Sequence, residues 1–251
     1  MKGKLLLAQA ALCLGLATPA HAAPLILPDR DCYTPGEEMV IEGLGFTAGA
    51  DIVFGISVLA PSGAVQNYVA GPITARDQGV FFAPVRSPDF ARKGDRRELM
   101  IVSATEQQSP DTGPTSFSVP LSAVGVDVAD WQAGRVKPGR LTRVRVYGIG
   151  PLIDSRGFLY EPGDPLYVHY LRGTRVVKTA KVGDLGTTCG DLDTRMRQFP
   201  FDVKPGTYTV VFDSASRYDR RAASVRYQVT VPRRGEKTTP STGVVKGRAA
   251  T

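Results

Sequence analysis

Residues 33–46 read YTPGEEMVIEGLGF, and residues 136–150 read VKPGRLTRVRVYGIG. Both segments contain a Pro-Gly turn, then a run of strand-forming residues, and then a Gly-x-Gly sequence. Pro35 and Pro138, the prolines of the two turns, lie 103 residues apart, which matches the length of one β-sandwich domain of about 100 residues. The repeat therefore predicts two similar β-sandwiches in tandem.

Short runs rich in β-branched and aromatic residues continue on both sides of these segments, separated by turns that contain Gly, Pro and Asp. The chain of 251 residues has 27 Gly and 19 Pro, which favours many short elements, and no run has a helical period over about ten residues. We expect strands at residues 39–46, 51–60, 64–73, 79–85, 97–104 and 115–121, and then at 124–131, 140–150, 165–171, 175–183, 196–203, 207–213 and 224–231.

The first 22 residues have the pattern of an export signal. Lys2 and Lys4 precede an apolar stretch, and the small residues Ala20 and Ala22 then mark a cleavage point. The apolar stretch of about 13 residues is shorter than the roughly 20 that span a bilayer. We therefore expect cleavage after Ala22, and a protein that is secreted to the extracellular space or cell envelope without a transmembrane span.

These patterns predict an all-β protein made of two tandem immunoglobulin-like antiparallel β-sandwiches. The first covers residues 23–122 and the second covers residues 123–233. Residues 234–251 are small, polar and basic, with too little apolar surface to offset the entropy of ordering them. We expect this last segment to be a disordered tail.

The stretch YTPGEEMVIEGLGFTAGADI, residues 33–52, resembles the opening of bacterial extracellular immunoglobulin-like domains of the IPT/TIG kind. In that family a Pro-Gly turn precedes a strand, then Gly-x-Gly-Phe, then a second turn. The second segment departs from the pattern, because Pro151 replaces the aromatic residue after its Gly-x-Gly. The resemblance implies a tandem of modules used for binding, adhesion or spacing at cell surfaces, and it brings no catalytic residues.

Catalytic and metal-binding chemistry has few candidate residues. His169 is the only histidine after the expected signal, so a Cys/His mechanism would have to pair it with Cys189, in a TTCGD context that lacks a peptidase signature. One His and two separated Cys do not make a usual zinc set. Asp184, Asp191 and Asp193 lack the EF-hand spacing for calcium. We therefore expect no enzyme, no metal and no cofactor.

The expected function is a noncatalytic binding or structural module of the cell surface or extracellular space. One alternative is an envelope-associated carbohydrate-binding protein, with Trp131, Tyr160, Tyr167 and Tyr170 as candidate stacking residues. A second alternative is a cell-wall-modifying enzyme that uses Cys189 and His169. The basic excess is mild and lacks long charge runs, which favours a protein or an anionic envelope polymer as partner over nucleic acid.

Cys32 and Cys189 are the only cysteines after the expected signal, and they lie 157 residues apart in different halves. An oxidising compartment favours their pairing. A bridge, however, needs Cα atoms within about 7 Å, and the sequence does not establish that the two domains approach so closely. A disulfide between the sandwiches and two separate buried thiols are both compatible with the sequence.

Overall fold

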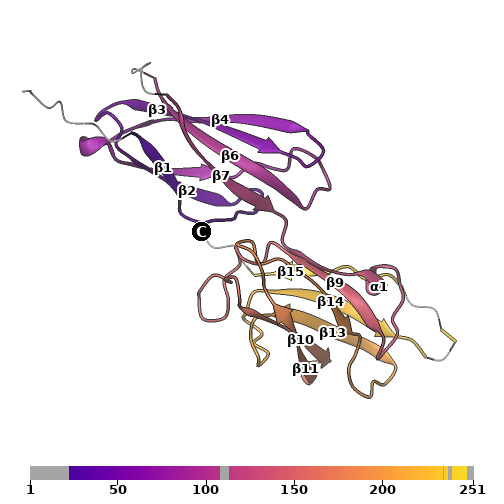
Figure 1. The fold of residues 1–251 in the computed structure, drawn as a ribbon. Helices are drawn as coiled ribbons and strands as arrows, with labels where there is room; N and C mark the ends of the chain where they lie inside the picture. Colours follow the sequence, from indigo (N-terminus) through magenta and orange to yellow (C-terminus); the bar gives the residue numbers. More distant parts are fainter. Residues whose placement is uncertain (1–22, 108–112, 234, 237–238, 248–251) are drawn as a thin grey trace, which may run out of the picture.

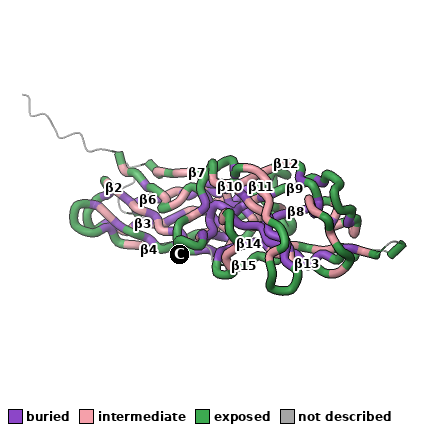
Figure 2. The backbone as a smooth tube through the Cα atoms, turned by 90° about the horizontal axis from the view of Figure 1, so that it is seen from below, coloured by how far each residue is buried: buried purple, intermediate pink, exposed green. Residues whose placement is uncertain are grey.

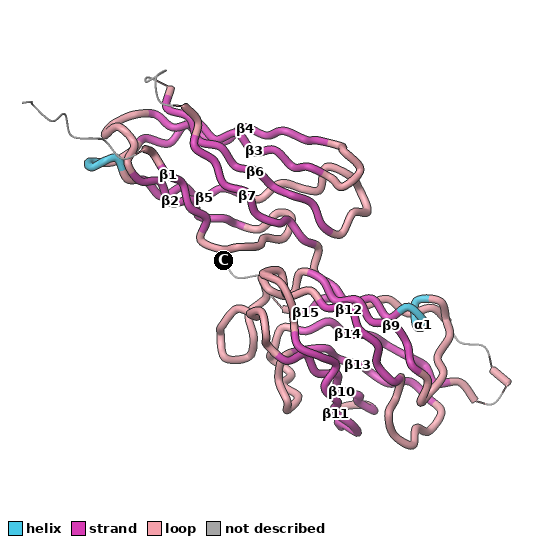
Figure 3. Tube along the Cα trace, in the orientation of Figure 1, coloured by secondary structure: helices cyan, strands magenta, loops and turns pink. Residues whose placement is uncertain are grey.

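The computed structural model describes residues 23–107, 113–233, 235–236 and 239–247. The expected export signal lies outside these residues. Strands dominate, and only two short helical turns are present in the described part, drawn in cyan in Figure 3: η1 (Asp77–Gly79) and α1 (Ala129–Gln132). No helix among the described residues combines the length and hydropathy needed to cross a bilayer. The all-β prediction is confirmed.

The first sandwich pairs a sheet of three strands with a sheet of four, and all strand pairs are antiparallel (Figure 1). The smaller sheet has the order β1-β2-β5, with β1 at Leu25–Pro28, β2 at Glu38–Leu44 and β5 at Phe81–Arg86. The larger has the order β4-β3-β6-β7, with β3 at Asp51–Leu59, β4 at Val65–Thr74, β6 at Arg97–Glu106 and β7 at Thr115–Ser122.

The second sandwich repeats this plan with sheets of three and five strands. The smaller sheet has the order β12-β9-β8, with β8 at Gly125–Val128, β9 at Leu141–Tyr147 and β12 at Leu192–Arg197. The larger has the order β11-β10-β13-β14-β15, with β10 at Pro165–Arg172, β11 at Arg175–Asp184, β13 at Gly206–Asp213, β14 at Ser224–Val231 and β15 at Val244–Lys246.

Each sandwich encloses its own hydrophobic core. Every second residue of β3 from Ile52 to Val58 is buried, because alternate side chains of a strand point to the same face. In the second core Trp131 is fully buried, with its ring centroid 5.4 Å from that of Tyr227 and 6.0 Å from that of Phe199. The buried segments, purple in Figure 2, occupy the inside of both halves.

Three expectations from the sequence are wrong in detail. The strand expected at residues 124–131 is β8, which ends at Val128, and the helical turn α1 follows it at Ala129–Gln132. The strand expected at residues 196–203 is β12, which ends at Arg197 because Phe199 has a φ of 46° and Pro200 has no N–H to donate to a ladder. The expected disorder of residues 234–251 is also wrong for residues 244–246, the part of the described segment that forms a strand. There β15 pairs with the edge of β14, joining Val245 to Val225 in register.

The connection between the sandwiches is short. The Ala123 N–H donates to the Arg96 carbonyl at 2.8 Å, and the Arg96 guanidinium lies 5.1 Å from the centroid of the Tyr147 ring. Gly148, from the second Gly-x-Gly, has a φ of +62°, and a Cβ there would lie 2.1 Å from the carbonyl oxygen of Ala123. Glycine at this position therefore lets the end of β9 approach the connection closely.

A disulfide bond between Cys32 and Cys189 adds a covalent link between the sandwiches. Their Cα atoms are 5.4 Å apart, within the normal range, and both residues are buried. An ion pair accompanies the bridge, with Arg97 Nη1 at 2.6 Å from Asp191 Oδ2. In the chain-entropy model, closing so long a loop contributes on the order of 5 kcal/mol.

Thiol titration measures this bridge. We expect no free thiol from Cys32 or Cys189 when protein purified without reductant is denatured, and reaction of both after reduction. Both sulfurs titrating without reductant in a monomer would contradict the bridge.

Candidate functional site

The first sandwich is closed along one side and open along the other. On the closed side Tyr33 bridges the sheets, because its backbone N–H donates to Pro120 at 3.2 Å and its carbonyl accepts from Ser122 at 2.9 Å. On the other side β4 and β5 are the outer strands of opposing sheets, and no ladder joins them among the described residues. The open side contains a groove of about 610 Å³, which we call the β4–β5 groove.

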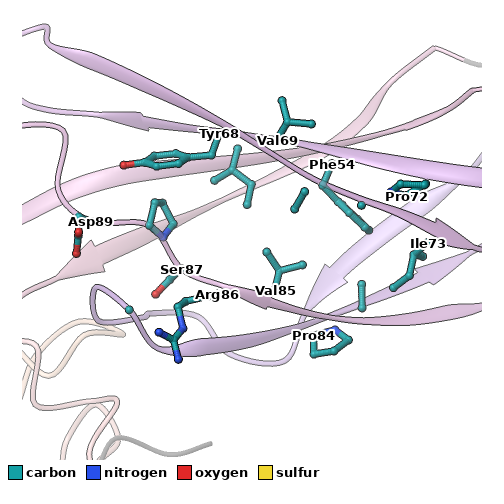
Figure 4. Close-up of a pocket in the computed structure, with 16 residues that line it drawn as sticks. Phe54, Tyr68, Val69, Pro72, Ile73, Pro84, Val85, Arg86, Ser87 and Asp89 are labelled. Carbon is teal, nitrogen blue, oxygen red and sulfur yellow. The ribbon is translucent and has the colours of Figure 1, made fainter.

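The interior of the β4–β5 groove is apolar (Figure 4). Phe54 of β3 and Val85 of β5 reach it from the core. Tyr68, Ala70 and Ile73 of β4 pack against that core and are only partly buried, since no further strand covers them. A few hundred cubic ångströms with apolar walls is the usual size of a ligand site.

The two ends of the groove differ. Figure 4 places Pro72 and Pro84 near one end, and Tyr68, Arg86 and Asp89 near the other. Desolvation, followed by the negative charges of Asp89 and Glu98, raises the pKa of the Tyr68 hydroxyl above its usual value. This end of the groove is therefore polar, with Arg86 and Asp89 both among its lining residues.

The first six residues of β4 lack the charges and prolines that normally protect sheet edges. Natural edges carry Lys, Pro or other charges that discourage further pairing. The β11 edge has Lys178 and Lys181, and β5 has Pro84. Residues 65–70, VQNYVA, contain neither a charge nor a proline, and Val69 is 79% exposed.

Pro72 limits this unprotected edge at its far end, because proline has no N–H for a ladder. The register between β3 and β4 also shifts between Ile52 and Phe54, and regular pairing resumes only at Ile52 and Ile73. The usable edge is therefore Val65–Ala70, beside the apolar part of the groove. The sequence predicts a strand here, but the position of that strand at an edge depends on strand order.

His169 lies in a separate buried cluster on the second sandwich. Its Nε2 is 3.0 Å from Asp213 Oδ1, and its Nδ1 is 2.8 Å from Thr179 Oγ1. Both His169 and Asp213 have fully buried side chains, and the Tyr218 ring packs over the imidazole at 5.7 Å. Asp213 Oδ1 also accepts the Ala215 N–H at 2.9 Å. This arrangement ties β10, β11 and β13 to the loop after β13.

Replacing His169 by Ala should lower the free energy of unfolding by about 3 kcal/mol, because the buried Asp213 carboxylate loses its partner. Thr179→Val removes only a neutral hydrogen bond and should cost about 1 kcal/mol. Urea denaturation measures both values. An unchanged midpoint for His169→Ala would show that the pair contributes no stability.

The aromatic residues considered for carbohydrate stacking do not form an exposed platform. Trp131 donates from Nε1 to the buried Gln198 at 3.0 Å, and Tyr160 donates from its hydroxyl to Ala223 at 2.9 Å. Burial raises the pKa of Tyr160 to about 12. Tyr170 is also buried, and only Tyr167 is partly exposed. The core takes three of the four rings because they are the largest apolar groups available.

The remaining candidate residues are engaged elsewhere. Cys189 forms the disulfide, so the expected alternative of a Cys189/His169 enzyme lacks its thiol. Asp184 pairs with Lys181 at 2.6 Å, Asp191 pairs with Arg97, and Asp193 pairs with Arg143. Across the described residues, no group of three or more His, Cys, Asp or Glu side chains is placed to hold a metal ion.

No protein-family model and no curated protein matches this sequence. Red sea bream transglutaminase is similar at 12% identity and a TM-score of 0.30, over 78% of this chain and 29% of that chain. A tetra-tandem repeat in the extending region of a large adhesion protein is similar at 13% identity and a TM-score of 0.27, over 89% and 48%. This chain thus spans less than half of either protein, and at these scores neither similarity assigns a function.

Proposed function

We propose that this protein is a secreted, noncatalytic binding module of the cell surface or extracellular space. Its ligand is an extended segment of another polypeptide, which it binds at the β4–β5 groove. The observation that carries the proposal is the unprotected edge Val65–Ala70 lying directly beside an apolar groove. The tandem of immunoglobulin-like modules implied by the sequence resemblance fits the same use.

The binding mode follows from strand geometry. An added strand would form backbone hydrogen bonds with the free side of β4, and these bonds require no particular sequence. Because strand side chains alternate, every second residue of the ligand would point toward Phe54 and Val85, while the others would lie beside Val69 on the outer face. Apolar residues at alternate positions are therefore the expected specificity.

The second sandwich contains an internal example of the same interaction. The segment Val244–Lys246 follows a long connection and adds itself as β15 to the edge of β14. Gly243, just before it, lies close against the ring of Tyr227. A short extended segment with small and β-branched residues is thus compatible with an edge of this kind of sheet.

A second candidate function is attachment to an anionic envelope polymer. Residues 123–233 contain 18 Lys and Arg against 11 Asp and Glu. Arg143 and Arg145 of β9 and Arg195 and Arg197 of β12 lie on the outer face of one sheet, where Asp193 offsets part of their charge. Such a basic face attracts polyanions in a salt-dependent way.

A labelled synthetic peptide of alternating Val and Thr, flanked by Lys, tests the groove by fluorescence anisotropy. We expect saturable binding that Val69→Lys weakens at least about tenfold, because a lysine on an edge strand opposes pairing. Val177→Lys is the matched control, since Val177 is an exposed valine on the edge strand β11. Equal binding by the Val69→Lys and Val177→Lys variants would contradict the proposal.

The basic face is tested by retention on a polyanion column. Arg195→Glu/Arg197→Glu should elute at clearly lower salt than the unchanged protein, because two cations of the face become anions. Arg175→Glu/Lys178→Glu on β11 is the control with the same change in net charge. Identical elution of the two double variants would argue against a localised polymer site.

A further inference from the structure

The C-terminal strand of this protein has the properties expected of a ligand for its own groove. β15 is extended, and its sequence Val-Val-Lys follows the small residues Thr242 and Gly243. It already forms an antiparallel ladder with β14, so its conformation is suited to edge pairing.

The present position of β15 buries little of its apolar surface. Val244 is 67% exposed and Val245 is 41% exposed. The contacts that hold the segment are mostly polar: the Ser241 N–H donates to the Trp131 carbonyl at 3.0 Å, and Lys246 Nζ donates to the Arg220 carbonyl at 2.7 Å. In the β4–β5 groove, one of the two valines would instead contact Phe54 and Val85, and apolar burial is the larger driving force.

Charge also favours this pairing. Residues 23–122 carry 12 Asp and Glu against 7 Lys and Arg, whereas the chain after Val231 carries five Lys and Arg against one Glu. Asp89 lies at the same end of the groove as Tyr68 (Figure 4). The basic segment after Val231, which includes β15, and the acidic first sandwich therefore attract one another.

We propose that β15 of one copy pairs with β4 of a second copy, so that copies join head to tail. This inference rests on the proposed function, because it names the ligand of the same groove. The two surfaces are different parts of the chain, so the contact is heterologous, and each added copy carries one strand and one groove for the next copy. The twelve residues 232–243 that precede β15 reach up to about 40 Å when extended, which lets the strand leave β14 and reach a neighbour.

The internal site on β14 competes with this contact. β15 is tethered beside β14 at a high effective concentration, so exchange between copies is favoured only as protein concentration rises. Gly243 is central to the internal site, since a Cβ there would lie 2.9 Å from the Tyr227 ring and from Val225. The Tyr227 ring is buried and its hydroxyl is bonded to the Val126 carbonyl, so the ring has little room to move.

Sedimentation velocity over a series of concentrations tests the assembly. We expect the protein to form oligomers as concentration rises. Val69→Lys in the groove and the double variant Val244→Asp/Val245→Asp in the strand should each keep the protein monomeric. Circular dichroism verifies that both variants are folded. A mixture of these two variants should restore one 1:1 dimer and no larger species, because each variant retains one intact half of the contact.

Gly243→Val provides a change in the opposite direction. The added side chain displaces the strand from β14 while keeping its valines, so oligomers should form at a concentration at least about tenfold lower. Thr242→Val is the matched control, with an added β-branched residue one position earlier, and should assemble like the unchanged protein.

Three results would overturn the inference. The first is that the unchanged protein and Gly243→Val both remain monomeric at every concentration. The second is that dimers persist in Val244→Asp/Val245→Asp but are lost in Val69→Lys. The third is that the mixture of these two variants stays monomeric. The second result would assign the dimer to β4 pairing with β4. In each of these cases, the proposed function would still be supported if the Val/Thr peptide binds the groove. If the peptide does not bind, both the proposed function and the assembly are contradicted.

Discussion

β4 is the outermost strand of the larger sheet in the first sandwich, and no strand of the described residues pairs with its outer side. Four strands face three, and Tyr33 forms a bridge to Leu121 of β7 at the opposite side of the sandwich. Tyr68, Ala70 and Ile73 therefore belong to the core and also line an open groove. In the second sandwich, the corresponding edge of the larger sheet does not stay free, because β15 pairs with β14 there. A free edge in one half and an added strand in the other are the basis of the functional proposals.

The contacts between the two sandwiches determine how the free edge of β4 and the strand β15 are positioned relative to one another. The Cys32–Cys189 bridge, the Arg97–Asp191 ion pair and the close approach of Gly148 to the connection hold the two sandwiches end to end (Figure 1). The acidic first half and the basic second half are therefore separated along one molecule. Two domains held together by a disulfide and an ion pair lose less conformational entropy on binding a ligand than two domains joined by a flexible linker.

The sequence predicted most of the strands and their grouping into two sandwiches, because local alternation and turn chemistry carry that information, but it did not predict β1. It left the disulfide open, since the approach of Cys32 to Cys189 depends on how the two halves pack. It missed the groove because the edge position of residues 65–70 follows from long-range strand order. It also misjudged residues 244–246, whose order comes from pairing with β14 rather than from apolar content of their own.

Amide hydrogen exchange along β4 tests the central claim most directly. In the free protein, the outward-facing amides between Val65 and Ala70 should exchange quickly, since they have no strand partner, while those bonded to β3 exchange slowly. Saturating Val/Thr peptide should slow the outward-facing amides and leave the edge of β11 unchanged. Protection of these amides before any ligand is added, or no change on adding it, would contradict the account of β4 as an open strand-binding edge.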